Sequence, residues 1–116
     1  MKRIIFLAII ILFGSCSDKG AVDRPENLVP KDKMVEIIKD LTKLEAHIKI
    51  NYPSVAQFHK VMIKSGDSLF SSHKVTAEDF DGSMDYYGMN QQEMKDIYSE
   101  ALDKLNQELG ALQSEK

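Results

Sequence analysis

Apolar residues recur at helical spacing along the middle of this 116-residue chain. From residue 34 they stand three and four positions apart in alternation, and charged residues fall largely between them. The members of this stripe are Met34, Ile37, Leu41, Leu44 and Ile48. Such spacing places an apolar face along one side of a helix, so it predicts a helix over about residues 32–50.

A second helix is predicted after the break at residues 51–54. Pro53 suits the first turn of a helix, where a backbone N–H would have no partner in any case. Apolar residues then continue as far as Phe70, which predicts a helix that ends at about Ser72. Gly66 lies inside it, at a place where glycine costs roughly 1 kcal/mol relative to alanine. The sequence therefore predicts a kink or a break near Gly66.

Two capping signals divide the last third of the chain. Thr76 followed by Asp79 resembles a capping box and predicts a short helix that stops at Gly88. Asn90 followed by Glu93 repeats the signal and predicts a long final helix. No segment shows the period-two alternation of a strand. The sequence therefore predicts an all-α fold, a small four-helix domain with two long helices, one kinked helix and one short helix.

The final helix carries the most regular apolar stripe in the chain. Its members are Met94, Ile97 or Tyr98, Ala101, Leu102, Leu105, Leu109 and Leu112. Since a long helix of this kind packs its apolar face against the rest of the domain, Leu102 and Leu105 in the middle of the stripe are expected in the core. Truncating either to alanine is then expected to cost roughly 2–5 kcal/mol.

The first sixteen residues have the form of a bacterial lipoprotein signal. Lys2 and Arg3 are followed by an unbroken apolar run over residues 4–13, and small residues at 14–15 precede Cys16, the only cysteine. Ten helical residues span only about 15 Å, roughly half of a bilayer's hydrocarbon core, so a cleaved export signal is favoured over a membrane span. We predict a signal peptide over residues 1–15 and lipidation at Cys16. The alternative is an ordinary secretory signal followed by a free thiol.

Residues 16–30 are predicted to be the lipidated cysteine and a flexible tether, with the helical domain over residues 31–116. The tether contains Gly20, Pro25 and Pro30 and shows no apolar period. A lipid anchor without an acidic export cluster beside it favours a bacterial cell-envelope location, at the outer membrane and facing the periplasm. The formal net charge of −3 becomes −5 when Lys2 and Arg3 leave with the signal, which argues against nucleic acid as a partner.

The stretch from residue 30 to residue 109 resembles a known family. The residues that carry the resemblance are Pro30, Met34, Asp40-Leu41, Glu45-Ala46, His73-Lys74-Val75-Thr76, Phe80, Ser83, Tyr86-Tyr87 and Ile97-Tyr98. On these residues the chain is similar to the small bacterial lipoproteins grouped as domain of unknown function family 4296. It departs from the family at Thr42, where histidine is frequent, at Lys74, where glycine is frequent, and at Gln91, where proline is common. The resemblance implies a helical, lipid-anchored envelope protein, and it supplies no catalytic residue.

Motifs for enzymatic or metal chemistry are weak. His47, His59 and His73 stand 12 and 14 positions apart, which is not the spacing of a zinc site, so no metal ligand and no cofactor is predicted. A calcium loop centred on Gly82 would need ligands at Ala77 and Gly88, which carry no carboxylate. The 65–68 segment holds two serines and an aspartate but lacks the Gly-x-Ser-x-Gly elbow. We therefore do not expect an enzyme.

Tyr86, Asp81 and Asp85 are the candidate partner-binding residues. Asp81 and Asp85 lie one helical turn apart, and Tyr86 cannot share the core face with Tyr87 because neighbouring residues are rotated by about 100°. The alternative is that Tyr86 packs on the neighbouring long helix and is not offered to a partner. Residues 75–103 hold eight acids against Lys95 alone, whereas residues 31–64 hold seven lysines against four acids. The acids are expected to be matched partly within the domain and partly by a basic partner.

Two functions of different class fit the sequence. The first is a lipid-anchored interaction or scaffold module, an accessory subunit of an envelope complex with a protein partner. The second is a periplasmic chaperone-like helper with an apolar groove between helices, suggested by the methionines of the mature chain. A groove of that kind would expose several methionines together, whereas a scaffold would bury them.

Overall fold

The computed structural model describes residues 23–115, and this part of the chain is helical throughout its regular structure, without a strand. Four helices follow one another: α2 (Lys31–Asn51), α3 (Val55–Ser72), α4 (Ala77–Gly88) and α5 (Gln91–Ser114). The prediction of an all-α, four-helix domain is confirmed. The predicted signal peptide and Cys16 lie outside the described residues.

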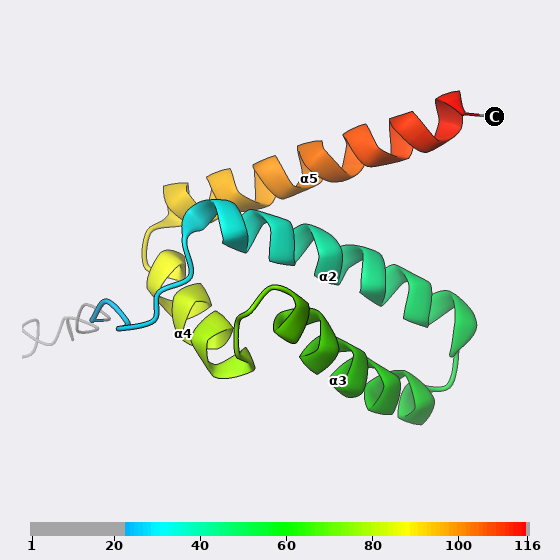
Figure 1. Ribbon diagram of the computed structural model, residues 1–116, viewed down its shortest axis with the longest axis horizontal. Helices are drawn as coiled ribbons and strands as arrows, with labels where there is room; N and C mark the ends of the chain where they lie inside the picture. Colours follow the sequence, from blue (N-terminus) through cyan, green and yellow to red (C-terminus); the bar gives the residue numbers. More distant parts are fainter. Residues whose placement is uncertain (1–22, 116) are drawn as a thin grey trace, which may run out of the picture.

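Helix α2 is the centre of the arrangement. It contacts both α3 and α5, whereas α4 contacts α5 across the end where α2 begins. Figure 1 shows α3 running back along α2 in the opposite direction, and α5 running beside α2 in the same direction. The two long helices diverge toward the C-terminal end of α5. Lys104 and Glu108 of α5 still form ion pairs with α2, whereas the end of α5 beyond them diverges from α2.

The core lies where the first half of α2 meets α4 and the start of α5. Its buried members are Val29, Met34, Val35, Ile37, Ile38, Phe80, Tyr87, Ile97 and Ala101. The α2 stripe predicted from its spacing is covered, and Ile48 near the end of that helix is buried as well. Phe70 of α3 stacks on Phe80 of α4 with ring centroids 4.9 Å apart, which joins the third helix to this core.

Two side chains of α4 hold the segment that leads into α2. The Val29 N–H donates to Ser83 Oγ at 2.9 Å, and the Tyr87 hydroxyl donates to the Val29 carbonyl at 2.8 Å. Ser83 and Tyr87 are one helical turn apart, so both reach the same backbone. Both groups of the Val29 backbone are thereby paired inside the core, as buried backbone requires. The folded domain therefore includes Val29, two residues ahead of α2.

The predicted caps of α4 and α5 are confirmed. Thr76 Oγ1 accepts a hydrogen bond from the Asp79 N–H at 3.0 Å. Asn90 Oδ1 accepts from the N–H groups of Gln92 and Glu93 at 3.1 and 3.3 Å. Each cap satisfies backbone donors that have no partner within the helix, which fixes where the helix starts.

Helix α3 ends in a Schellman motif that has lysine in place of glycine. The Val75 N–H bonds the Phe70 carbonyl and the Lys74 N–H bonds the Ser71 carbonyl, both at 3.0 Å. Lys74 has φ of 57°, in the left-handed region that this motif requires and that favours glycine. The left-handed φ of Lys74 gives a physical reason why glycine is frequent at this position in the family that the chain resembles.

Two expectations about burial and helix continuity are wrong. Helix α3 runs without interruption through Gly66, which is buried, so of the kink or break predicted there the break does not occur. Packing along α2 outweighs a local cost of roughly 1 kcal/mol. Leu102 is 56% exposed and Leu105 is only half-buried, so neither belongs to the core. The buried residues of α5 are Ile97 and Ala101, on the adjoining face.

Candidate functional site

A continuous apolar strip runs along the outer side of α5. We define the α5 ridge by five residues: Tyr98, Leu102, Leu105, Leu109 and Leu112. All except Leu105 are exposed, by 49 to 61% of their surface. The intervals between them are four, three, four and three residues, which keeps them on one side of the helix for about four turns. Within the described residues, this strip is an extended apolar surface with four of its five side chains exposed.

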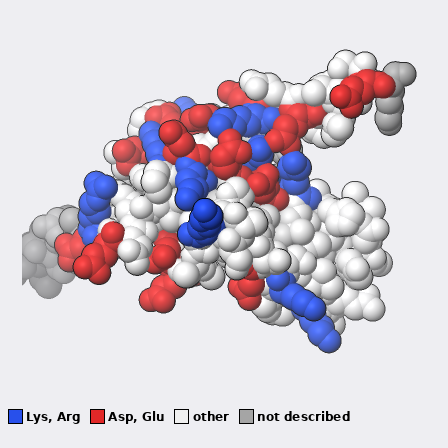
Figure 2. Space-filling view, viewed as in Figure 1, with Lys and Arg blue, Asp and Glu red and all other residues white. Residues whose placement is uncertain are grey.

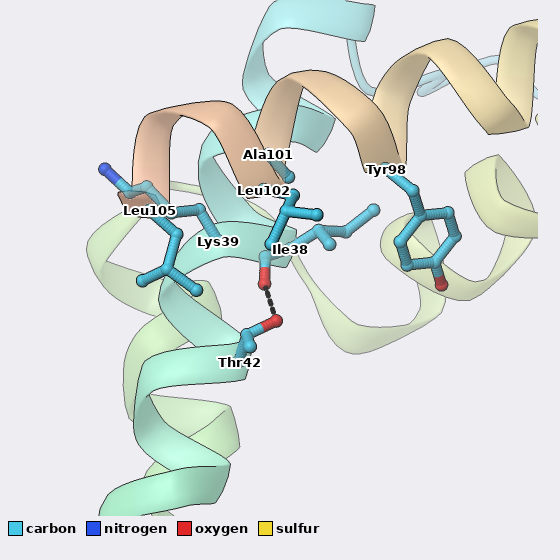
Figure 3. A pocket seen from close by; sticks show the side chains of 7 residues that line it. All are labelled: Ile38, Lys39, Thr42, Tyr98, Ala101, Leu102 and Leu105. Carbon is cyan, nitrogen blue, oxygen red and sulfur yellow. Dashed lines mark hydrogen bonds between the residues drawn. The ribbon is translucent and has the colours of Figure 1, made fainter. Parts of the chain in front are cut away.

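The first half of the ridge forms one wall of a groove between α5 and α2. The groove has a volume of about 230 Å³ and is lined by Ile38, Lys39, Thr42, Tyr98, Ala101, Leu102 and Leu105. Figure 3 shows Tyr98 at one end and Leu105 at the other, with Leu102 pointing between them toward α2. The Thr42 hydroxyl donates to the Ile38 carbonyl at 2.8 Å, so this polar group is satisfied within its own helix. The groove therefore presents mainly carbon to a ligand.

Ion pairs between α2 and α5 fix which side of α5 faces outward. Lys104 Nζ lies 2.6 Å from Glu36 Oε1, and Glu108 accepts from Lys39 at 2.5 Å and from Lys43 at 2.6 Å. These groups occupy the α2-facing side of α5, and the ridge lies about a quarter of a turn around the helix from them, beside the groove. The same rotation places Ile97 and Ala101 in the core.

The close pairing shifts the pKa values of the groups involved. Hydrogen bonds from Lys104 and Lys39 lower the pKa of Glu36 from 4.5 to about 2. Hydrogen bonds to Glu108 and Glu36 raise the pKa of Lys39 above its ordinary value. Lys39 and Lys43 together lower the pKa of Glu108. These groups are consequently charged across the neutral pH range, and they form a structural network rather than an acid–base pair poised near pH 7.

The three candidate partner-binding residues do not share one surface. Asp81 and Asp85 are both exposed, and neither has a basic partner within 4.0 Å among the described residues. Tyr86 is half-buried and contacts the core, with its ring edge-on to Tyr87 at a centroid distance of 5.5 Å. Five residues of helix rotate a side chain by about 140°, which separates Tyr86 from Asp81. The structure thus brings the two carboxylates together and leaves the tyrosine on another side.

The lysines of residues 31–64 and the acids of residues 75–103 are mostly not paired with each other. Within the described residues, Lys31 Nζ lies 3.9 Å from Asp96 Oδ2, and this is the one pair that joins a lysine of 31–64 to an acid of 75–103. Figure 2 shows acidic and basic side chains interleaved over α2 and α5.

The end of the molecule at the turn from α2 to α3 shows few charges in the same view. Ile50 and Val55 are strongly exposed there, beside a small groove lined by Tyr52, Pro53 and Phe58.

The one described side-chain contact between a histidine and a carboxylate joins two helices. His73 Nε2 lies 2.9 Å from Asp40 Oδ2, a contact that ties the end of α3 to α2. Within residues 23–115, no three His, Cys, Asp or Glu side chains gather closely enough to hold a metal ion. None of the helices described there is both long enough and apolar enough to cross a membrane.

Several residues that carry the family resemblance have visible structural roles. Ser83 and Tyr87 hold Val29, and His73 meets Asp40. The burial of Ser83 was not predicted, although its place one turn before Tyr87 puts both residues on the same side of α4. The outward direction of the α5 ridge was also missed, and its heptad-like spacing was the available signal.

The comparison with protein families identifies the chain. Residues 25–110 match the family described as Domain of unknown function (DUF4296). No curated protein and no solved structure matches the chain significantly. The match covers well over half of the 116 residues, so the chain belongs to this family.

Proposed function

We propose that this DUF4296 protein is a lipid-anchored interaction module of the bacterial cell envelope, an accessory subunit without catalytic activity. Its lipid is carried on Cys16, and its place is the outer membrane, facing the periplasm. In this proposal the helical domain serves as a rigid carrier of a docking surface. The observation that supports it is the α5 ridge, an ordered apolar strip left uncovered on a helix that is fixed from its other side.

The ridge is suited to a helical partner. Helices pack by inserting side chains spaced three and four residues apart into the gaps of a neighbouring helix. The ridge offers five such side chains, and the groove beside it is lined mainly by apolar groups of α2 and α5. The ion pairs of Lys104 and Glu108 hold α5 in one rotation before a partner arrives. Such preorganisation lowers the cost of binding.

The chaperone-like alternative receives less support from the methionines. Met34 is fully buried, and Met62, Met84 and Met94 are partly buried. Only Met89 is exposed among the five, and none of them lines the groove between α2 and α5. An adaptable client-binding groove would present several flexible methionine side chains together. The leucine-rich ridge instead favours a defined partner.

The acidic end of α4 is a second candidate docking surface. Asp81 and Asp85 stand side by side on it and are exposed, which suits a basic partner. Exposed charges of this kind mainly raise the association rate and make it depend on salt. We assign them a steering role and the α5 ridge the larger share of the binding energy.

Site-specific photo-crosslinking of the full chain in membranes tests the proposal. A photo-reactive phenylalanine analogue at Leu109 is expected to give a discrete protein adduct, because this residue lies on the ridge and is half exposed. The same analogue at Gln107, an exposed residue on the opposite side of α5, is the matched control. A third variant, with the analogue at Asp85, reports on the acidic surface. Equal adducts at 109 and 107, or none at either, would remove the ridge as a docking surface.

The anchor is tested separately. Replacing Cys16 with serine removes the thiol that takes the lipid, so metabolic labelling with a fatty-acid analogue should be lost and the precursor should stay uncleaved or mislocalised. Labelling of the wild-type chain is the positive control. If the Cys16→Ser variant still incorporates the label, the lipoprotein assignment is wrong.

A further inference from the structure

We infer that the partner on the α5 ridge is a second copy of this chain, with the two ridges packed against each other in opposite directions. The inference rests on the proposed function, because it names the occupant of the same surface. A two-fold contact uses one patch twice, so it requires a patch that is complementary to itself. The α5 ridge meets this requirement in its spacing and in its charge.

The spacing is self-complementary. Ridge side chains alternate at intervals of four and three, which corresponds to positions a and d of a heptad repeat held for two heptads. A second α5 helix offers the same intervals, so side chains of each copy fall into the gaps of the other. Leucine at most of these positions gives compatible side-chain volumes on both sides of the contact.

The charges beside the ridge are also compatible with a second copy. The open flank, away from α2, carries Ser99, Asn106 and Gln113, which are uncharged and lie seven residues apart. On the flank toward α2, Glu108 is already paired with Lys39 and Lys43. Exposed charges beside the ridge are Lys95 at its start and Glu115 at its end, so like charges face each other only when two copies lie parallel. Lys95 is the only charged side chain in line with the described part of this flank, so a strongly charged partner would find few opposite charges there, which favours self-association.

The direction follows from Lys95. This residue lies about one turn before Tyr98 on the same side of α5 and is exposed. In a parallel pair the two Lys95 ammonium groups would face each other, which is unfavourable. In an antiparallel pair they lie at opposite ends of the contact. We therefore assign the antiparallel direction.

The size of the contact predicts moderate affinity. The ridge is about 21 Å long, and a helix is about 10 Å wide, so the contact falls at the small end of protein interfaces. Two copies anchored in the same membrane meet at a raised effective concentration, which strengthens a weak contact. The protein should therefore be tested as the full chain in its membrane.

The experiment uses two differently tagged copies of the full chain, expressed together, with the photo-reactive phenylalanine analogue at Leu112. We expect an adduct that carries both tags and has twice the mass of one chain. Peptide mapping should place its second attachment between residues 95 and 102, the other end of the ridge. Adding Leu102→Glu is expected to reduce the doubly tagged adduct by about thirtyfold or more, as for loss of a central interface residue. Gln107→Glu places the same charge on the opposite side of α5 and should leave the adduct unchanged.

The outcomes separate this inference from the proposed function. An adduct with a different protein, and none with both tags, would overturn the second copy while keeping the ridge as a docking surface. The absence of any adduct from the ridge positions would overturn both. Attachment close to residue 112 of the other copy would overturn the antiparallel direction. A doubly tagged adduct that Leu102→Glu does not reduce would show that copies meet through another surface.

Discussion

The stripe of α2 and the ridge of α5 have nearly the same pattern and opposite surroundings. Both contain five apolar residues at alternating intervals of three and four. On α2, Met34, Ile37 and Ile48 are fully buried beneath the other helices. On α5, Leu102 and Leu112 are more than half exposed. Helical spacing therefore predicts an apolar face, without stating whether the rest of the chain covers it.

The cover over α2 comes from three directions, and α5 lacks an equivalent. Helices α3 and α5 lie along α2, and Val29, held by α4, closes its start. Helix α5 is contacted by α2 and α4 on one side, and its C-terminal end diverges from α2 (Figure 1). The apolar side of α2 therefore contributes to the core, whereas the outer side of α5 stays largely exposed within the described residues.

The largest expected effect separates the two stripes directly. Ile37→Ala removes a fully buried side chain from the core and is expected to lower the free energy of unfolding by roughly 2–5 kcal/mol. Leu102→Ala removes a side chain that is more than half exposed, and it should cost well under half as much. Chemical denaturation of both variants, read by circular dichroism, gives the comparison. Equal losses would mean that the ridge is packed within the chain.

A smaller effect is expected from the cover at the start of α2. Ser83→Ala leaves the buried Val29 N–H without its acceptor, which should lower the free energy of unfolding by about 1–3 kcal/mol. Amide hydrogen exchange at Val29 should accelerate more than exchange at Ile97, because the lost bond is local. Ser99→Ala, at an exposed position on α5, is the control and should change neither quantity. Unchanged exchange at Val29 would contradict the proposed clamp.

A change remote from both stripes should stabilise the fold. Lys74→Gly places glycine at the left-handed position of the α3 Schellman motif, where lysine is strained, and should raise the free energy of unfolding by up to about 1 kcal/mol. The gain is reduced by the greater freedom of glycine in the unfolded chain. Thermal unfolding measures it, and Lys74→Ala, which keeps the strain, serves as the comparison. A loss of stability on introducing glycine would refute this explanation.

The smallest effect concerns the ion pairs that set the rotation of α5. The pKa of Glu36 is lowered to about 2, so its contribution to stability is complete above pH 4.5 and is lost as the pH falls toward 2. Glu36→Gln should therefore be less stable than the wild type at pH 6, and the difference should vanish near pH 2. The difference is modest because the carboxylate is partly exposed and screened by water. Glu45→Gln, whose partner Lys49 lies on its own helix, should show a weaker trend. If the stability difference between wild type and Glu36→Gln were the same at every pH, the ion pairs of Glu36 would not contribute to stability as described.

The sequence by itself determined where the helices lie. Apolar intervals located α2 and α5, and the caps at Thr76 and Asn90 set two helix starts, because a capping side chain bonds backbone groups only two or three residues away. The family assignment over residues 25–110 also agrees with the resemblance recognised from single residues. These features depend on neighbours in the chain, so they can be read without the fold.

Only the tertiary structure decided which apolar face is covered. Continuity through Gly66, burial of Ser83 and exposure of Leu102 all depend on helices far away in the sequence. The α2-facing side of α5 is paired with Glu36, Lys39 and Lys43, which lie more than sixty residues before their partners. The partial burial of Tyr86 against the core likewise depends on how α4 packs. The physical reason is that helical spacing fixes the existence of an apolar face, whereas its occupant is fixed by contacts between distant segments.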